Sequence, residues 1–411
     1  MSVVKKSIPK APVTVDELLE KIPDRLPSDI FLQVEANTNK WVPVLKANLF
    51  FKLLIYSCLT SHRLSLRIIS ENFKSPFFKM FSPSSKAQAV HSSIHARLEN
   101  VAVDYFKLMY EHFFDQVKEH YDEKKLKRNS LIRYDSTMIA VFSRLFQGMR
   151  VGKKSKKKSP KSQIKLTFGF ENDYLLNFKI YTTQTFLSED IALRDAIMAD
   201  VHPEGQIMTF DRGVQKRETF AKFAKVKREF VVRVRENIRF EPVREHTDEK
   251  GEWASWCGED TELVGDQIVK VFNGKNKLID TEFRLVTINR LSDGKRFYFL
   301  TDIMNLSPCD IAQIYRYRWD IEVLFRFLKQ ELDLGHFVNH DMNAIQILLY
   351  CKLIAAMLIL IYKKKNEIKS YIIAKIRFVN ELFSTIILDV VQTQEGVEDL
   401  KSILKNNILR I

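Results

Sequence analysis

The sequence predicts an α/β fold class, with strands and helices mixed in the middle of the chain and mostly helices on both sides. Three observations lead to this prediction. The chain has 411 residues, which is too long for one ordinary compact domain. Its composition, 45% hydrophobic and 11% aromatic, is sufficient for a sizeable core. Within residues 129–227, β-branched and aromatic runs appear in the order strand–strand–strand–helix–strand.

Residues 1–128 are predicted to be helical. A capping box of Thr14 and Glu17 begins a first helix, and apolar periodicity predicts a helix over 42–60 and one long or broken helix over 88–124. Between them, residues 74–86 contain prolines and serines and are predicted to form a loop.

A mixed segment of strands and helices, the first part of the α/β core, is predicted over residues 129–227. A strand is expected at 131–142, a hairpin at 166–182, a helix at 187–201 and a strand at 205–211. Residues 228–303 form a strand-rich segment with turn signals, and residues 304–340 carry a helix that begins at Ser307 and Pro308. Residues 341–411 are predicted to be helical. The apolar run 345–362 within this region is predicted to be a buried helix and not a membrane span, because Gln346 and Lys352 interrupt it.

The charge balance favours a polyanionic partner. Lys and Arg number 65 against 51 Asp and Glu, which gives a net charge of +14 and a pI near 9.4. Such a balance fits nucleic acid or an anionic membrane surface, and equally an ordinary basic protein.

The cysteines form no C-x-x-C pair and no P-loop spacing is present, so neither a zinc site nor ATP use is predicted. The N-terminus lacks the features of a signal peptide, and a cytoplasmic setting is expected.

A polar stripe lies on the predicted helix "YRYRWDIEVLFRFLK", residues 315–329. On one continuous helix, four side chains fall within about 60° of one another at 100° per residue, namely Tyr315, Arg318, Glu322 and Lys329. The opposite side carries apolar residues that face a core. The alternative is a solvated face in which Arg318 and Glu322 form an ordinary i,i+4 pair.

Two aspartates stand at unusual places in predicted strands. Asp135 lies within a strand, where aspartate is depleted, and Asp211 ends an apolar strand, where sites of α/β sheets collect. Each alone is more often a turn or cap residue. Together with Glu322 they would supply three hard oxygen ligands for Mg²⁺, and two such ions can cut a phosphodiester.

The spacing Y-x2-R-x3-E-x6-K of Tyr315, Arg318, Glu322 and Lys329 resembles the signature of the insertion-sequence-four family of bacterial DDE transposases. The upstream "YDST" with Asp135 and "FDRG" with Asp211 resemble the first and second aspartate motifs of that family, in the right order. The resemblance covers residues 131–340.

This resemblance implies a ribonuclease-H-like catalytic core with a β-rich insertion, flanked by N-terminal and C-terminal helical regions. Asp135, Asp211 and Glu322 would be the catalytic residues and would bind two Mg²⁺ ions, which Mn²⁺ could replace. The reaction would be nicking at a transposon end followed by attack of the freed 3′-hydroxyl, with Tyr315, Arg318 and Lys329 positioning DNA. The implied partners are double-stranded DNA, as terminal inverted repeats and target, and a second copy of the chain.

Further residues are DNA-binding candidates. Related enzymes hold a flipped base with a tryptophan of the insertion, so Trp253 and Trp256 are candidates, although packing inside the insertion is an equal alternative. A lysine cluster between the first strands is expected to contact the DNA backbone, with a solvated loop as the alternative; its members are Lys153, Lys154, Lys156, Lys157 and Lys158. Segments 65–73 and 92–106 would read the DNA ends, or else form a packing bundle.

Three other functions remain open at this point. The chain could be a transposase relic that binds DNA without catalysis, or a stand-alone metal-dependent nuclease that cuts without joining. A protein bound to a membrane surface is the third and is disfavoured.

Overall fold

The structure is a computed structural model that describes residues 34, 36–37, 44–81, 89–121, 131–141, 149–151, 161–171, 174–200, 205–246 and 260–392. It divides into two compact units. One is helical and combines Met1–Tyr121 with Arg326–Ile411, and the other, Asp122–Phe325, contains the sheet. The predicted capping box of Thr14 and Glu17 lies outside the described residues.

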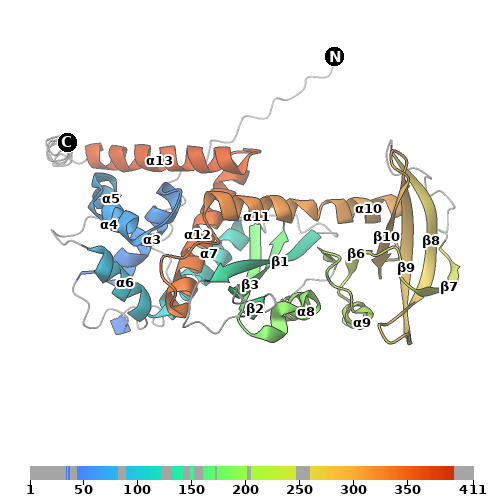
Figure 1. Ribbon diagram of the computed structural model, residues 1–411. Coiled ribbons are helices and arrows are strands. Elements are labelled where there is room, and N and C mark those ends of the chain that lie inside the picture. Colours follow the sequence, from blue (N-terminus) through green and yellow to red (C-terminus); the bar gives the residue numbers. More distant parts are fainter. Residues whose placement is uncertain are drawn as a thin grey trace, which may run out of the picture. The chain divides into compact units, whose positions relative to one another are not determined.

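Seven helices make up the described part of the helical unit: α3 (Ala47–Thr60), α4 (Leu66–Lys74), α5 (Pro76–Phe81), α6 (His91–Asn100), α7 (Val103–Tyr121), α12 (Met342–Lys365) and α13 (Tyr371–Gln392) (Figure 1). One prediction was wrong in part, because the loop expected over 74–86 contains α5. Of the two forms expected over 88–124, a long or a broken helix, the structure has the broken one, as α6 and α7. A proline at the first helical position, Pro76, is compatible with a helix start.

Helix α12 is buried along nearly its whole length, as the sequence predicted. It is the single helix among the described residues that is long and apolar enough to cross a membrane. Its most apolar 18-residue stretch has a mean hydropathy of 2.4, and 89% of this stretch is buried inside the protein. The one lysine in its middle, Lys352, is fully buried. Its ammonium group donates to the carbonyl oxygens of Asp333 at 2.5 Å and His336 at 2.7 Å, so the charge is hydrogen-bonded inside the unit.

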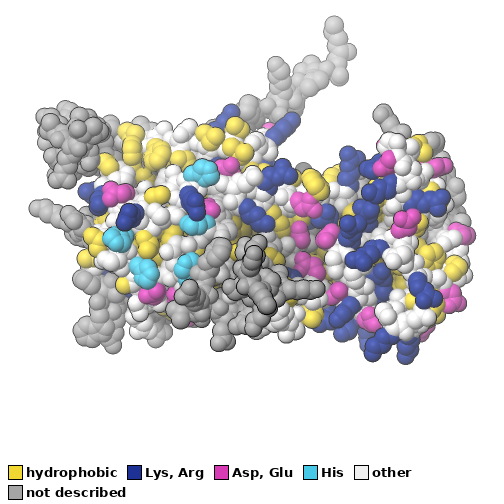
Figure 2. Space-filling model, viewed as in Figure 1, with side chains coloured by type: hydrophobic (Ala, Val, Ile, Leu, Met, Phe, Trp, Pro, Cys, Tyr) yellow, Lys and Arg dark blue, Asp and Glu magenta, His cyan; other side chains and the backbone are white. Residues whose placement is uncertain are grey.

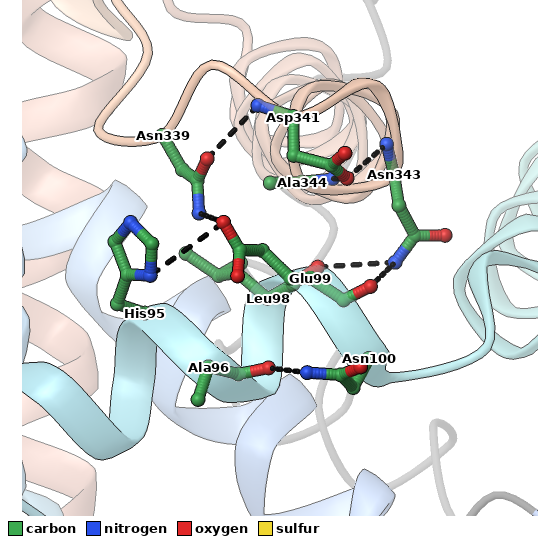
Figure 3. A network of polar contacts seen from close by, with 9 residues as sticks. All are labelled: His95, Ala96, Leu98, Glu99, Asn100, Asn339, Asp341, Asn343 and Ala344. Atoms are coloured by element: carbon green, nitrogen blue, oxygen red, sulfur yellow. Dashed lines mark hydrogen bonds and ion pairs between the residues drawn. The ribbon is translucent and has the colours of Figure 1, made fainter.

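Polar side chains join the start of α12 to the end of α6 (Figure 3). Asp341 caps α12 and accepts from the amide of Asn343 at 2.9 Å. The Asn343 side chain in turn donates to the carbonyl oxygens of Leu98 at 3.0 Å and Val101 at 2.7 Å, where α6 ends. One asparagine therefore satisfies carbonyl groups that the end of a helix leaves without partners.

The sheet unit has ten described strands: β1 (Leu131–Val141), β2 (Met149–Val151), β3 (Lys161–Glu171), β4 (Tyr174–Tyr181), β5 (Ile207–Phe210), β6 (Phe230–Val234), β7 (Phe240–Glu245), β8 (Thr261–Phe272), β9 (Leu278–Arg290) and β10 (Lys295–Thr301). They form one sheet in the order β2-β3-β1-β5-β6-β10-β9-β8-β7, with β4 also paired to β3. The predicted strand at 131–142 and the predicted hairpin are confirmed as β1 and as β3–β4.

The first five long strands have the arrangement of a ribonuclease-H-like core, as expected. Strands β3 and β4 run antiparallel to their neighbours, β1 pairs parallel with β5, and β5 pairs parallel with β6. The resulting order is β4-β3-β1-β5-β6. Strand β6 therefore belongs to this core sheet, and the β-rich insertion is formed by β7 to β10, which extend the same sheet from β6.

Helices cover both faces of the core sheet (Figure 1). On one face, α8 (Glu189–Ala199) and α9 (Arg217–Lys225) pack on alternate residues of β1, β5 and β6, among them Tyr134, Phe210 and Val232. On the other face, α10 (Pro308–Arg316) packs on Val231 and Phe299. Because side chains alternate along a strand, residues beside those of the first set, such as Asp135, lie on the α10 face.

The insertion is tied to the segment before α10 by a buried arginine, which is ion-paired within the insertion and hydrogen-bonded to that segment. Arg284 in β9 is fully buried and donates through Nε and Nη2 to the two carboxylate oxygens of Asp266 at 2.8 and 2.6 Å. Its Nη1 donates to the carbonyl oxygen of Leu306 at 2.6 Å. Helix α10 then begins at Ser307, whose side chain accepts from the amide of Asp310 as the sequence predicted. The two-point contact with Asp266 orients Arg284, and its Nη1 then holds the residue before the Ser307 cap of α10.

The helix predicted to carry the polar stripe is interrupted. It forms α10 and, after a break at Tyr317 and Arg318, α11 (Trp319–Glu331). At the break the backbone bonds span three residues: Arg318 to Tyr315 at 3.1 Å, and Ile321 to Arg318 at 3.2 Å. This tighter turn changes the angular relation of Tyr315 to Glu322, so a single continuous helix was a wrong assumption.

Candidate active site

Asp135 and Asp211 lie next to each other on parallel strands. The register pairs Tyr134 of β1 with Phe210 of β5; Asp135 is the next residue of β1, and Asp211 directly follows the end of β5. Adjacent strands are about 4.8 Å apart. The two carboxyl groups therefore start from the same level of the sheet. Both belong to the face on which α10 packs, since their neighbours Tyr134 and Phe210 are in the core under α8 and α9.

The Asp135 carboxyl group is held in an environment that disfavours its charge. Its pKa is raised to about 7, by burial first and also by the charges of Asp211 and Glu189, while the Ser136 amide and the Arg318 charge lower it. The Ser136 amide donates to Asp135 Oδ1 at 2.7 Å. A partly buried carboxylate next to another carboxylate is an environment that a cation would relieve.

The turn after Asp211 passes close to the start of α8. The amide of Gly213 donates to Asp211 Oδ2 at 3.2 Å. A Cβ atom at Gly213 would lie 2.9 Å from Glu189 Cγ, so a larger residue would force this turn away from α8. The neighbouring Asp190 accepts from the amides of Gln215 and Lys216, both at 2.7 Å. Helix α8 therefore holds the loop that follows the second aspartate.

Glu189 connects α8 to the strand that carries Asp135. It accepts a hydrogen bond from the Ser136 hydroxyl and forms an ion pair with Lys165 of β3, with Nζ 2.6 Å from Oε2. The Lys165 side chain is only 4% exposed and also donates to the carbonyl oxygen of Leu187 at 2.7 Å. These contacts fix the position of β1 next to Asp135, and the sequence analysis did not identify them.

Glu322 lies in the first turn of α11 and is bound to Arg318. Arg318 Nη2 donates to Glu322 Oε1 at 2.7 Å, and the arginine side chain is 10% exposed. Burial alone would lower the pKa of Arg318, but the charges of Tyr315, Glu322 and Asp211 raise it. Its charge also acts on Asp211 and Asp135, and it lines one cavity with Asp211, so Arg318 lies near the aspartates as well as beside the glutamate.

In this arrangement Arg318 is the cation beside Glu322. Among the residues that the structure describes, no group of three His, Cys, Asp or Glu side chains is arranged to hold a metal ion. The structure brings Asp135 and Asp211 together and places Glu322 one arginine away. The ordinary ion pair considered from the sequence is therefore present, although it lies beside the aspartates and not on a solvated face.

A cavity of about 440 Å³ opens next to these residues. It is lined by Asp211, Arg212, Arg233, Tyr315, Arg316, Arg318 and Trp319. Arg318 Nε and Nη1 are buried and have no hydrogen-bond partner among the described residues. A pocket with several guanidinium groups, one of them with unused donors, is chemically suited to phosphate.

The basic character continues from the cavity over the insertion. Arg233 of β6 lies 4.6 Å from the ring centre of Phe297, and Arg290 lies 5.3 Å from the same ring. Burial is the main cause that lowers the pKa of Arg233. The charges of Arg212, Arg290 and Arg318 lower it further, whereas the interaction with Tyr315 raises it. Figure 2 shows Lys and Arg side chains gathered over this part of the sheet, with Asp and Glu side chains beside them.

The remaining predicted residues are placed as follows. Tyr315 is partly buried, packs its ring against Phe299 and lines the cavity. Lys329 is exposed in α11, beyond the point at which that helix passes into the helical unit. Seven predicted DNA-binding residues lie outside the described residues: Lys153, Lys154, Lys156, Lys157, Lys158, Trp253 and Trp256.

Comparison with known proteins identifies the family of this chain. A family profile described as "Transposase DDE domain" matches residues 111–358, more than half of the chain. A Sinorhizobium fredii protein named as transposase y4zB is 28% identical over 164 residues, which is 40% of this chain and 44% of that protein. A Synechocystis protein named as the transposase of insertion sequence element IS4SA is 26% identical over 282 residues, covering 64% of this chain and 70% of that protein.

Two further matches complete the comparison. A Geobacillus stearothermophilus protein named as the transposase of insertion sequence element IS5377 is 25% identical over 180 residues, covering 44% of this chain and 45% of that protein. This chain thus spans less than half of two of the three relatives. The cryo-EM structure of the piggyBac transposase synaptic complex with hairpin DNA aligns at 12% identity with a TM-score of 0.49, covering 95% of this chain and 85% of that one, a likeness too weak to support an inference. The length of the family match, together with the strand order of the core, shows that the chain belongs to the DDE transposase family.

Proposed function

We propose that this protein is a cut-and-paste transposase that cleaves DNA at the ends of a mobile element and joins the freed 3′ ends to target DNA. The observation that carries the proposal is the position of Asp135 and Asp211, which follow paired residues of two adjacent parallel strands and lie beside a cavity lined by arginines. Carboxylates that gather cations and guanidinium groups that bind phosphate are the two components that phosphodiester cleavage requires.

The residues present fit a divalent metal. Asp135 is a partly buried carboxyl group whose charge is disfavoured without a cation, Asp211 is beside it, and Glu322 supplies a third hard oxygen donor. Two Mg²⁺ ions, or Mn²⁺ in their place, would activate the attacking water or 3′-hydroxyl and stabilise the leaving oxygen. In the protein alone, Arg318 balances the charge of Glu322.

Arg318 would connect DNA binding to the release of Glu322. Its Nε and Nη1 have unused donors, while its Nη2 is bound to Glu322. A DNA phosphate in the cavity would accept from this guanidinium and compete with Glu322 for it. Glu322 would then be available as a ligand when DNA is bound, so DNA and metal would bind cooperatively.

The DNA backbone would follow the basic residues from the cavity towards the insertion. Arg212, Arg233 and Arg316 line the cavity, and Arg290 lies beyond Phe297. Because Arg233 and Arg290 contact the same aromatic ring, their guanidinium planes are held in place with little loss of side-chain freedom on binding. Contacts of this kind position DNA without reading its sequence.

The wider functional setting follows from the same proposal. The partners would be double-stranded DNA of the element's terminal inverted repeats and of the target, bound by two copies of this chain. Helices α4 and α6, which pack on each other in the helical unit, would read the repeats. The protein would act in the cytoplasm of a bacterium.

A cleavage assay tests the proposal. The substrate is a duplex with the inverted repeats that flank the gene, and the proteins are the wild type, Asp211→Asn, Glu322→Gln and the control Glu282→Gln, which changes an exposed ion pair on the insertion. The wild type and the control should nick the duplex and transfer the 3′ end, whereas the two active-site variants should bind it without cutting. Binding without cutting by the wild type would indicate a relic, and cutting without joining a nuclease.

A further inference from the structure

Arg133 links the strand of Asp135 to the break between α10 and α11. It lies two residues before Asp135 in β1, so both side chains project from the same face of the sheet. Its side chain is 9% exposed. Arg133 Nε donates to the carbonyl oxygen of Tyr317 at 2.6 Å, and Nη2 forms an ion pair with Asp320 Oδ2 at 3.0 Å.

Two acceptors of Arg133, the Tyr317 carbonyl oxygen and the Asp320 carboxylate, lie on the two sides of the helix break. The Tyr317 carbonyl oxygen also accepts from the Asp320 amide at 3.2 Å, one of the three-residue bonds that define the break. Between Tyr317 and Asp320 lies Arg318, and two residues after Asp320 lies Glu322. A displacement of the break would therefore move both the arginine and the glutamate of the active site.

The contacts of Arg133 use the shape of the guanidinium group. Its Nη1 lies 3.4 Å from the carbonyl oxygen of Leu131, and the ring centre of Phe170 lies 5.8 Å from its Cζ. Three nitrogen atoms thus contact three acceptors that point in different directions, on top of an aromatic ring. A planar fork can make these contacts at once, whereas a lysine ammonium cannot span them.

We infer that Arg133 is a positioning residue of the active site, which sets the place of Glu322 and Arg318 relative to Asp135 by clamping the α10–α11 break through Tyr317 and Asp320. Arg133 touches neither substrate nor metal in this role. The inference rests on the proposed function in that Asp135 and Glu322 are taken as active-site residues. Displacements of about 1 Å in an active site reduce rates by about 100-fold, so the clamp has a measurable consequence.

The test compares four variants with the wild type. They are Arg133→Gln, Arg133→Lys, Asp320→Asn and the double variant Arg133→Gln/Asp320→Asn. The matched control is Arg244→Gln, because Arg244 forms an exposed ion pair with Glu282 at 2.9 Å on the insertion, away from the break. Cleavage of the end duplex is measured against Mg²⁺ concentration, DNA binding is measured separately, and hydrogen exchange reports on the amides of residues 318–321.

The clamp predicts a specific set of results. Arg133→Gln and Arg133→Lys should slow cleavage by about 10- to 100-fold and raise the Mg²⁺ concentration needed, with DNA affinity within about twofold of the wild type. Asp320→Asn, which leaves the Tyr317 contact intact, should slow cleavage by about two- to fivefold. The double variant should be no slower than Arg133→Gln alone, since the two residues act through one contact. The amides of residues 318–321 should exchange hydrogen faster in Arg133→Gln than in the wild type, and at the wild-type rate in Arg244→Gln.

Two results would overturn the inference. One is cleavage at the wild-type rate and Mg²⁺ dependence by Arg133→Gln and Asp320→Asn. The other is an unchanged exchange rate at residues 318–321 in the Arg133 variants. If Arg133→Gln does not fold, Asp320→Asn decides alone, because its side chain is half exposed and its loss leaves the core intact. Failure of the wild type to cut would refute the proposed function, whereas the exchange measurement would still decide whether the clamp exists.

Discussion

Replacing Asp135 by asparagine should make the metal-free protein more stable at alkaline pH. Burial raises the pKa of Asp135 from 3.8 to about 7 in the folded protein, a difference of about three units. Each unit corresponds to 1.36 kcal/mol, so the ionised carboxylate costs about 4 kcal/mol of folding free energy above pH 7. Asparagine keeps an oxygen acceptor for the Ser136 amide and carries no charge.

The sign of the pH dependence follows from linkage. Below pH 3.8 the carboxyl group is protonated in both folded and unfolded chains, so it brings no penalty. As pH rises from 3.8 to about 7 the unfolded chain loses its proton first, and the wild type loses stability over this range. The advantage of Asp135→Asn in the free energy of unfolding should therefore be about 4 kcal/mol at pH 8, less than half of that at pH 5, and close to zero at pH 3.

Urea unfolding of both proteins at the three pH values, in EDTA, measures this difference. Asp280→Asn is the control, because that carboxylate is fully exposed on the insertion and its replacement should leave the pH profile unchanged apart from the loss of its partner Lys270. Addition of Mg²⁺ should stabilise the wild type, by about 2.7 kcal/mol at 100 times its Kd, and leave Asp135→Asn unchanged. Equal stability of the two proteins at pH 8 without metal would refute the assignment of Asp135 as a buried, charge-strained ligand.

Three other predictions concern DNA, the insertion and the metal. Arg233→Gln should weaken binding to all DNA sequences and lower the salt slope of log Kd by about one, as measured by fluorescence anisotropy at several salt concentrations; an unchanged slope would place Arg233 away from the backbone. Asp266→Asn should destabilise the protein by about 3–5 kcal/mol in thermal unfolding, because it leaves the fully buried Arg284 without its counter-charge; a loss below about 1 kcal/mol would show that water reaches this pair. Mn²⁺ should replace Mg²⁺ in cleavage whereas Ca²⁺ should support binding alone, and cutting in Ca²⁺ would contradict the metal chemistry proposed here.

The sequence predicted those parts of the fold whose signal is local. Strand β1 and the β3–β4 hairpin are marked by β-branched and aromatic runs between turn residues, and α10 is marked by Ser307 and Pro308 at its start. The aspartates were recognisable because Asp135 interrupts a strand and Asp211 ends one. That the two lie level on adjacent strands depends on a parallel pairing across 76 positions, which no local pattern encodes.

The break between α10 and α11 could not be predicted by the same means. No proline or glycine marks Tyr317 and Arg318, so apolar periodicity runs through the break and the angular positions were computed for one continuous helix. The tighter turn is stabilised from outside the helix, by Arg133 at a distance of 184 residues along the chain. Tertiary contacts of this kind override local propensity.

Several residues near the site were also missed. Glu189 stands at a helix start, where an acidic residue is expected for electrostatic reasons alone, and its partner Lys165 lies 24 residues upstream. Arg233 had a usable signal, because a charged residue within the apolar run of β6 projects to the same face as Val231. A partly buried arginine in such a strand indicates either an ion pair or a binding site.

Metal uptake at the three acidic residues tests the central claim most directly. Protein bound to a pre-cut end duplex is titrated with Mn²⁺, and the unbound ion is followed by its electron paramagnetic resonance signal. The account predicts two Mn²⁺ ions per active site for the wild type and fewer for each of Asp135→Asn, Asp211→Asn and Glu322→Gln. Uptake by all three variants equal to that of the wild type would contradict it.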